Sequence, residues 1–496
     1  MSDKILFWLP NSLASFGVVK LIKEKHDCEI FAIADIVDKQ KQFYENQQLI
    51  KFKKIWYLHD YISKTAKKSD LEYLMSIEEK YKINLWLLAY NERIFYRFND
   101  YHKFSSDEVL SILEQECKLF EIILEETKPD FVVMGVRVFH QEQIFYEICK
   151  SKGIRVLTLE STNFGYRAMI IDGTENFNLK DYDKNITKSL HELQDYLKSF
   201  NPAKQGIKFT KTYQNSKLDY LKAALKFLLS RNTNVNTHYT YYGRTKFKVV
   251  FKMLIYTLKK QYREFFINRN FSQEIDDSHP FIYFPLHIEQ EQVLLIGAPF
   301  YTNQLEVITN IVKSLPVGYK LVVKEHPIMV LRGWRSIATY KKIMELPNVK
   351  LLHPSVNSTE IIKKCSLVIT INGSAGLEAS FYQKPSVVFV DTNYSILPSV
   401  YKLKSIDELP RSIHSSLKNE VKISDLNKYV NLIHGNSFEY DGLGLDNSMY
   451  NYFFYGGFLI DAEISVDKMN SFLEENSNTF TLLANEFIKK IKLSKL

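Results

Sequence analysis

The regular alternation of short apolar runs with segments of helical period constrains this chain more than any other feature. In its first part, the runs of strand length are Lys4–Leu9, Glu29–Ala34, Asp130–Met134 and Ile154–Leu159. Patterns of helical period over Ser12–Lys25, Ser106–Thr127 and Gln141–Lys152 separate them. Strands that alternate with helices are typical of a parallel, doubly wound sheet, so we expect an α/β fold.

Two details of this first part are predicted less directly. Ser12 is a candidate N-cap for the helix that follows it, because a serine hydroxyl can accept a bond from a free backbone N–H. Between residues 36 and 100 the pattern is weaker, with strand-like runs at Ile55–Leu58 and Leu85–Ala89.

A second alternating set follows residue 276. Its expected strands are Pro280–Pro285, Tyr319–Val323, Val349–Leu352, Leu367–Ile371 and Ser386–Val390. Its expected helices are Asn303–Ser314, Arg335–Glu345, Ser358–Cys365 and a segment from about residue 375 to Tyr382. Later in the chain, Val466–Glu475 and Phe480–Leu493 also have helical period.

The 496 residues are enough for two or three domains. We expect an N-terminal Rossmann-like domain over 1–180 and a basic helical insertion or linker over 181–275. A second Rossmann-like domain would cover 276–425, and a helical region over 426–496 would pack back onto the rest.

Positive charge is concentrated in one segment. The chain has a net charge of +8, while residues 201–270 hold 15 Lys and Arg against two acids, a net of +13. Apolar and basic residues alternate there at helical spacing, in Leu218–Leu229 and Lys246–Phe266. A basic amphipathic helix suits an anionic membrane surface, and a solvated helical insertion is the equally open alternative. No nucleic-acid motif accompanies the charge, so we expect no nucleic-acid partner.

Four scattered cysteines without a CxxC spacing fit a reducing compartment. The first eight residues carry an acid and only a short apolar run, and no stretch reaches the length of a membrane span. We therefore expect a cytoplasmic protein, with peripheral attachment to the inner membrane as an open question.

Polar residues follow two of the strands in the second set. Lys324 and His326 come directly after one strand, and Pro327 fixes the turn. Gly373 and Ser374 follow another strand and open a helix. Because loops at the carboxyl edge of a parallel sheet meet ligands, and small residues let a phosphate approach the backbone, these loops predict a phosphate site.

The same helix carries Glu378 one turn after its start, where the carboxylate could accept hydrogen bonds from a ribose. Each motif alone has an ordinary structural explanation: a small-residue turn, a loop histidine, or an acid near a helix N-terminus. Their joint occurrence favours the binding site.

These residues resemble the capsule polysaccharide biosynthesis family, which includes bacterial Kdo transferases. The resemblance spans residues 281–405 and rests on five segments: FIYFPL from Phe281, LVVKEHP from Leu321, PNVKLL from Pro347, SLVITINGSAGLEA from Ser366, and Lys384-Pro385 followed by Asp391–Tyr394.

The resemblance implies a GT-B glycosyltransferase, with two Rossmann-like domains facing a cleft and the nucleotide on the second domain. Relatives that use CMP-sugars imply that His326 contacts the phosphate, with Ser374 and the Gly373 backbone nearby. Glu378 would contact the nucleoside, and Ser358 and Thr359 would add phosphate contacts.

Candidate catalytic residues lie after the last strand of the first set. Kdo transferases carry a Glu-Asp-Gly-Phe-like segment there, and this chain has Glu160 followed by Ser161 in place of the Asp. Glycosyl transfer needs a carboxylate to stabilise an oxocarbenium-like state or a base to deprotonate the acceptor. Glu160 is the first candidate and Asp172 the second.

Two further residues are candidates for substrate binding. Arg167 would pair with a sugar carboxylate or with an internal acid. His140 closely follows a strand and would line the cleft, or be structural. No HExxH, loop DxD or Cys/His cluster is present, so we expect no metal and no cofactor beyond the nucleotide-sugar.

The expected function is transfer of a sugar, with Kdo or another CMP-activated acidic sugar as the candidate, to a surface polysaccharide, lipopolysaccharide or lipid-linked acceptor. Alternatives are a polyol-phosphate or UDP-sugar transferase on the same scaffold, or a non-catalytic polysaccharide-assembly protein.

Overall fold

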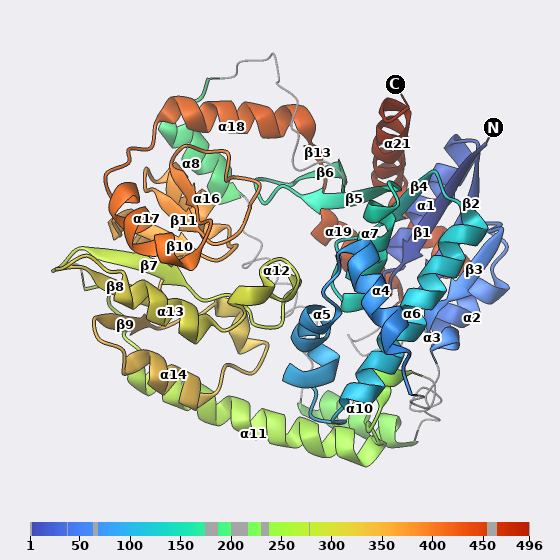
Figure 1. Cartoon of the computed structure of the whole chain (residues 1–496), viewed down its shortest axis with the longest axis horizontal. Coiled ribbons are helices and arrows are strands. Elements are labelled where there is room, and N and C mark those ends of the chain that lie inside the picture. Colours follow the sequence, from blue (N-terminus) through green and yellow to red (C-terminus); the bar gives the residue numbers. More distant parts are fainter. Residues whose placement is uncertain are drawn as a thin grey trace.

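The chain folds into two α/β halves that are joined along one side by a long helix (Figure 1). The computed structural model describes residues 2–36, 38–62, 68–173, 187–199, 217–229, 238–276, 278–453 and 464–495. Both halves have the doubly wound α/β architecture that the strand and helix pattern predicts.

The first half contains a seven-stranded sheet with the order β13-β6-β5-β4-β1-β2-β3. Its strands are β1 (Asp3–Leu9), β2 (Cys28–Ala34), β3 (Lys54–Tyr57), β4 (Phe131–Met134), β5 (Arg155–Ser161), β6 (Arg167–Asp172) and β13 (Phe438–Glu439). The strands from β3 to β5 are parallel, while β6 and β13 add to one edge as antiparallel strands. These two edge strands were not expected from the sequence.

Helices cover both faces of this sheet because alternate residues of each buried strand point to opposite sides. Leu6 and Trp8 of β1 pack toward α6 (Ser106–Thr127) and α7 (His140–Ser151). Ile5 and Phe7 pack on the other side with α1 (Ala14–Lys25) and α21 (Ser477–Leu493). Other helices of this half are α2 (Asp38–Asn46), α3 (Leu58–Tyr61), α4 (Leu71–Tyr81), α5 (Leu85–Asn91) and the π-helix η1 (Arg93–Arg97).

The end of the chain returns to the first half. Helices α19 (Gly442–Phe453), α20 (Val466–Glu475) and α21 share a core with α1, whereas α18 (Ile423–Asn436) packs on the second half. A Cβ atom at Gly17 would lie 2.5 Å from the Phe480 ring, so glycine allows α1 and α21 to approach closely.

The second half contains a six-stranded, fully parallel sheet with the order β12-β11-β10-β7-β8-β9. Its strands are β7 (Phe281–Pro285), β8 (Lys320–Lys324), β9 (Val349–Leu352), β10 (Leu367–Thr370), β11 (Ser386–Val388) and β12 (Val400–Lys402). The strand order reverses between β7 and β10, and in such sheets ligands bind at the carboxyl edge of this switch point.

Two helical layers cover the second sheet. On one face lie α13 (Gln304–Lys313), α14 (Ile337–Met344) and α17 (Leu409–Ser416), and on the other α15 (Ser358–Lys364) and α16 (Ala375–Phe381). Short elements complete this half: α8 (Leu190–Ser199), α12 (Gln292–Leu295), η4 (Pro299–Tyr301), η5 (Pro327–Val330) and η6 (Ile406–Glu408).

The basic segment forms α10 (Lys217–Leu229), the short η3 (Tyr239–Tyr241) and α11 (Lys246–Asn270). Near the start of α11, Lys248 donates to the carbonyl of Tyr101 in the first half. Near its end, Arg263 donates to two carbonyls before α14, and Ile267 is buried in the second core. Helix α11 thus bridges the two halves (Figure 1). Among the described helices, none is both long enough and apolar enough to cross a bilayer.

Two local predictions are wrong. Leu85–Ala89 forms helix α5 rather than a strand, because Asn84 caps it by accepting from the Leu87 N–H over 2.8 Å. An uninterrupted apolar run has no period that separates a short strand from a buried helix. Ser12 does not cap α1, which begins after Leu13 without a side-chain cap.

Candidate functional site

The switch point of the second sheet is built around His287, which follows β7. Its Nε2 accepts from the backbone N–H of Asn372 over 3.3 Å and lies 3.3 Å from the hydroxyl of Thr370. Because the side chain is fully enclosed, burial lowers its pKa to about 3, with His326 and Arg335 nearby adding to the effect. A neutral histidine therefore joins the loops after β7 and β10.

Gly373 lies against this histidine for a steric reason. A Cβ atom there would come within 2.6 Å of the Thr370 hydroxyl and 3.1 Å of His287 Nε2. The Gly373 carbonyl accepts from the Tyr394 hydroxyl, and its N–H donates to Thr370 over 3.1 Å. The loop is thus held close to the sheet edge by side chains from three segments, of which the sequence had not singled out the one with His287.

Lys324, at the end of β8, makes the central contact of a polar cluster beside the switch point. Its Nζ donates to the hydroxyl of Ser358 over 2.7 Å. Burial lowers the pKa of Lys324 to about 8, and the carboxylate of Glu378 partly opposes this shift. The cluster therefore keeps a cation that is mostly protonated at pH 7 and loses its proton as the pH rises past about 8.

Glu378 joins the same cluster from α16. One of its oxygens accepts from the Thr359 hydroxyl over 2.8 Å, and burial raises its pKa. Ser358 and Thr359 are the first residues of α15, which Asn357 caps. Four residues named from the sequence thus converge here, namely Lys324, Ser358, Thr359 and Glu378.

His326 is half-buried next to this cluster. Its Nδ1 accepts from the N–H of Ile328 over 3.3 Å, so the proton of the neutral ring resides on Nε2. Burial lowers its pKa to about 4, assisted by Lys324 and Arg335. Pro327 begins the 3₁₀ turn that this histidine caps.

The two expected phosphate loops are not adjacent. Strand β7 lies between β8 and β10, so His287 occupies the position between the Lys324–Pro327 loop and the Gly373–Ser374 loop. Ser374 is exposed and makes no capping bond in α16. The sequence did contain a signal for His287, since it follows a predicted strand by two residues.

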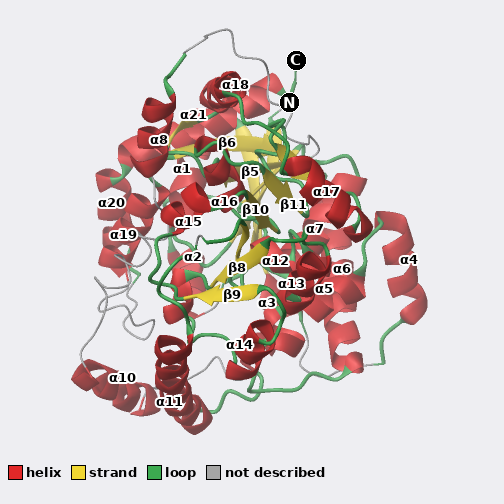
Figure 2. Ribbon diagram, turned by 90° about the vertical axis from the view of Figure 1, so that its left-hand side faces the viewer, coloured by secondary structure: helices red, strands yellow, loops and turns green. Residues whose placement is uncertain are grey.

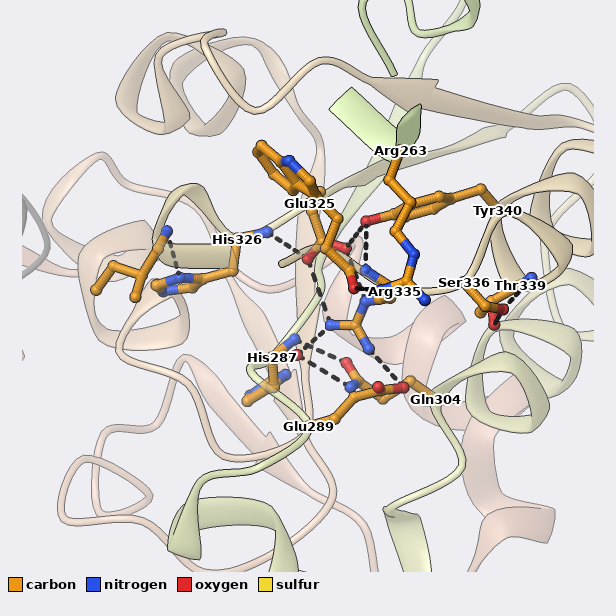
Figure 3. A network of polar contacts seen from close by, with 12 residues as sticks. Arg263, His287, Glu289, Gln304, Glu325, His326, Arg335, Ser336, Thr339 and Tyr340 are labelled. Carbon is orange, nitrogen blue, oxygen red and sulfur yellow. Dashed lines mark hydrogen bonds and ion pairs between the residues drawn. The ribbon is translucent and has the colours of Figure 1, made fainter. Parts of the chain in front are cut away.

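The loop after β8 is held by a buried ion pair that the sequence analysis missed (Figure 3). Glu325 is fully buried and accepts from Arg335 Nε over 2.7 Å and from the Tyr340 hydroxyl over 2.7 Å. Arg335 also donates to the carbonyl of His287 and pairs with Glu289 over 2.8 Å. The network fixes the backbones that carry His287 and His326.

Glu160 lies at the carboxyl end of β5 in the first half. It is largely buried, and burial raises its pKa while nearby Arg137 opposes the rise. Two residues later, the carbonyl of Thr162 accepts from Asn393 of the second half over 2.8 Å. The tip of the β5–β6 hairpin also inserts Phe164 against Phe381, with ring centroids 5.2 Å apart. Glu160 therefore lies next to the contact between the halves.

Asp172 lies elsewhere. It pairs with Leu157 across the strands, toward the opposite end of β5 from Glu160, and its side chain is 2% exposed. Its carboxylate lies 4.0 Å from Arg155 Nε. The structure separates the two candidate carboxylates and leaves only Glu160 at the carboxyl edge.

Arg167 and His140 both contact other parts of the protein, which is one of the two alternatives that the sequence left open for each residue. Arg167 donates to the Ser437 hydroxyl over 2.8 Å and to the Ser437 carbonyl over 2.6 Å, which attaches β13 to the sheet. The His140 side chain is 1% exposed and lies 3.0 Å from both Glu92 and Glu116. These two carboxylates raise the pKa of His140 to about 10 against the effect of burial.

A cavity of about 280 Å³ opens between the halves beside the ion-pair network of Arg335 and Glu289. Arg97 of η1 lines it from the first half, and residues at the start of α13 and α14 line it from the second. Nearby, Asn91 donates to the Pro299 carbonyl over 3.2 Å. The two halves therefore face each other across a cleft, with Arg335 between this cavity and the His287 loop.

Residues 187–399 match the model of a family described as capsule polysaccharide biosynthesis protein. This match confirms the resemblance inferred from the motifs. It also begins before α10, so the basic segment lies inside the matched region. No curated protein matches the chain.

Three of the solved structures that are similar to the chain show how low the sequence identity is. The β-Kdo 2,4-transferase of Thermosulfurimonas dismutans KpsC has 12% identity and a TM-score of 0.30, covering 61% of this chain and 79% of its own. The β-Kdo 2,7-transferase of the same protein has 13% identity and a TM-score of 0.28, covering 64% and 89%. UDP-GlcNAc 2-epimerase from Methanocaldococcus jannaschii has 14% identity and a TM-score of 0.25, covering 84% and 94%.

Proposed function

We propose that this chain is a glycosyltransferase that moves a sugar from a nucleotide donor to a surface polysaccharide or lipid-linked glycan. The observation that carries the proposal is the Lys324–Ser358 contact beside Glu378 and the His287–Gly373 loop, at the carboxyl edge of the second sheet. The family that matches this region makes capsule polysaccharide, and such polymers grow by glycosyl transfer.

The cluster has the chemistry to hold the charged part of a nucleotide. Lys324, which already donates to a hydroxyl, can turn its ammonium to a phosphate oxygen, and His326 Nε2–H can donate to another. Gly373, which has no side chain, lets its loop lie against Thr370 and His287 beside these donors. These donors would stabilise the negative charge that develops on the leaving phosphate.

Glu378 is suited to the nucleoside end. Its carboxylate accepts from the Thr359 hydroxyl, and burial raises its pKa. Ribose hydroxyls would donate hydrogen bonds to the lone pairs of this buried group that Thr359 leaves free.

Glu160 is the proposed catalytic carboxylate. A carboxyl group whose pKa is raised by burial can exchange a proton nearer neutral pH, and its ionised form can stabilise an oxocarbenium-like sugar. Its place next to the contact between the halves fits a donor bound on the second half and an acceptor bound on the first.

The nucleotide is best identified by comparing the affinities of the protein for different nucleotides. We propose a CMP-activated acidic sugar, with Kdo as the first candidate, and the alternatives are a UDP-sugar or a CDP-alcohol. Calorimetric titration with CMP, CDP and UDP separates them, and tightest binding of UDP would overturn the CMP assignment. Failure of all three to bind would overturn the transferase proposal.

Ser161 is the feature that favours a non-catalytic assembly protein, because a carboxylate is expected in its place. Donor hydrolysis distinguishes the two possibilities. Release of free sugar from CMP-Kdo by the purified protein, absent in Glu160→Gln, supports the enzyme. Nucleotide binding without turnover of any donor, with or without glycan acceptor, supports the assembly protein.

The basic segment would hold the enzyme at an anionic lipid surface. Along α11, six apolar side chains follow one another at intervals of three or four residues, and each is more than half exposed: Phe247, Phe251, Leu254, Leu258, Tyr262 and Phe265. Lys252, Lys259 and Lys260 belong to the same helix. Helices α10 and α11 stand at one margin of the molecule (Figure 2). Apolar side chains in the interface with lysines near lipid phosphates are the arrangement of a peripheral helix.

Vesicle co-sedimentation tests the membrane proposal. We expect wild-type protein to bind vesicles containing phosphatidylglycerol at low salt and Phe251→Ser/Leu258→Ser to lose binding. A control variant of exposed lysines on the second half, Lys363→Glu/Lys418→Glu, should bind as wild type. Equal sedimentation of wild type with neutral and anionic vesicles would contradict the electrostatic part of the proposal.

A further inference from the structure

Three side chains that are far apart in the sequence meet in the first half. Asp35 follows β2, His59 lies in α3, and His238 precedes η3. His59 Nε2 is 2.6 Å from an Asp35 carboxylate oxygen and also within contact of His238 Nε2. Their ligand atoms all lie within 4.8 Å of one another, and both imidazoles are buried.

Hydrogen bonds alone do not satisfy the contacts among Asp35, His59 and His238. The N–H of Thr240 donates to His238 Nδ1 over 3.0 Å, so a neutral His238 carries its proton on Nε2, facing His59. His59 Nε2 would then have to accept that proton while presenting a lone pair to the Asp35 oxygen. If His59 Nε2 instead carries a proton for Asp35, two N–H groups point at each other.

A cation at the common point removes the clash between the two Nε2 atoms, because it accepts all three lone pairs. The proton of His238 would then lie on Nδ1 and donate to the Thr240 hydroxyl, 2.5 Å away, in place of the bond that Nδ1 accepts from the Thr240 N–H. Gln141 already donates to the second Asp35 oxygen over 3.1 Å. Such bonds to the far side of a ligand orient metal-binding side chains.

Charged groups of both signs lie near the cluster. Glu142 lies close enough to Asp35 for the two carboxylates to interact and favours a cation, whereas the positive charge of Arg244 near His238 opposes one. The acid beside the ligands adds to the negative potential that a cation would meet.

We propose that Asp35, His59 and His238 bind one divalent transition-metal ion of the zinc type. Two imidazole nitrogens and one carboxylate oxygen are a donor set that Zn²⁺ accepts, with a fourth position left for water. Ligands of tetrahedral zinc, at about 2.0–2.2 Å from the metal, lie about 3.3 Å apart, so His59 would move away from both Asp35 and His238 on binding.

The metal would attach the bridge between the halves to the first half. His238 is followed by Tyr239, whose hydroxyl donates to buried Glu116 over 3.0 Å, and then by α11. A ligand bond at His238 would therefore anchor the start of the segment that leads into α11. The sequence analysis predicted no metal because the ligands are 24 and 179 residues apart and form no local motif.

Metal analysis of the full chain, purified without a polyhistidine tag, tests the proposal. After dialysis against Zn²⁺ and removal of loose metal, we expect about one zinc ion per chain by mass spectrometry. Co²⁺ substitution should give the visible absorption of a four-coordinate site. The melting temperature of wild type should fall with EDTA and recover with Zn²⁺, which requires no variant.

Matched variants locate the site. His238→Gln should lose bound zinc, Gln141→Leu should weaken binding about 10- to 100-fold, and His279→Gln, at an exposed histidine, should keep it. If His238→Gln does not fold, the cobalt spectrum and EDTA shift of wild type decide. Wild type without zinc, without a cobalt spectrum and without an EDTA effect would overturn the proposal, as would full zinc binding by His238→Gln.

Discussion

The Nζ of Lys324 donates to the hydroxyl of Ser358 over 2.7 Å, and this bond joins the end of β8 to the start of α15. Thr359, the next residue, donates to Glu378 of α16 over 2.8 Å. A cation and an anion from different strand–helix units are thus held apart by two hydroxyls, instead of neutralising each other in a direct ion pair. This leaves both charges available to a ligand that carries phosphate at one end and hydroxyls at the other.

Replacing Lys324 by methionine should weaken nucleotide binding. A hydrogen bond to a charged group contributes about 1.5–3 kcal/mol, which corresponds to a Kd increased about 10- to 150-fold by calorimetry. Lys320→Met, at the other end of β8 and paired with Asp276, is the matched control and should bind nucleotide as wild type. Equal Kd values for Lys324→Met and wild type would remove Lys324 from the site.

Donor binding should weaken with rising pH because Lys324 loses its proton. Burial lowers its pKa to about 8, and a phosphate prefers the protonated form. The Kd should therefore be nearly constant below pH 7 and rise about tenfold per pH unit well above pH 8. His326, with a pKa of about 4, stays neutral over this range. In Lys324→Arg, whose guanidinium stays charged, the rise should disappear; a rise of the same size in this variant would assign it to another group.

Glu160→Gln should lower kcat by about 10²–10⁴ while leaving the donor Kd within about twofold, because a general acid or base acts on the chemical step. Asp172→Asn is the comparison, since Asp172 lies toward the other end of β5 and is enclosed in the sheet. Initial-rate measurements on both variants would contradict the assignment if Asp172→Asn lost turnover and Glu160→Gln retained it.

His140→Gln should destabilise the first half. The substitution leaves Glu92 and Glu116 buried without their shared cation, and removing one partner of a buried pair costs about 3–5 kcal/mol.

The pH dependence identifies the charged form of His140. Its folded pKa, about 10, is above the unfolded value of about 6.5, so its contribution is complete below pH 6.5 and is lost as the pH rises through 10. Urea unfolding should therefore show the wild-type advantage over His140→Gln shrinking from pH 6.5 to 10. An advantage that stays constant over this range would contradict a protonated His140.

The sequence predicted the elements whose pattern is set locally. β1 and β7 are buried strands with continuous apolar runs, and α6 covers the residues Ser106–Thr127 that its helical period predicts. The strand–helix alternation also predicted that Lys324 and Glu378 would reach one edge of a sheet, and the family resemblance added Ser358. Their contacts confirm that these residues meet.

What the sequence could not predict depends on partners that are distant along the chain. Arg167 carries the same charge whether it faces a sugar or the backbone carbonyl of Ser437. Its partner is decided by the distant segment before β13, which returns to the first half. His287 becomes central because β7 lies between β8 and β10, which is a property of strand order. His140 is buried because Glu92 and Glu116 enclose it from other helices.

Calorimetric titration of CMP, CDP and UDP into wild type, His326→Ala and Glu378→Ala tests the central claim most directly, with circular dichroism as the check that each variant is folded. We predict that wild type binds at least one of these nucleotides and that both folded variants bind it at least about tenfold more weakly. Unchanged affinity in both variants would contradict a nucleotide site at the carboxyl edge of the second sheet.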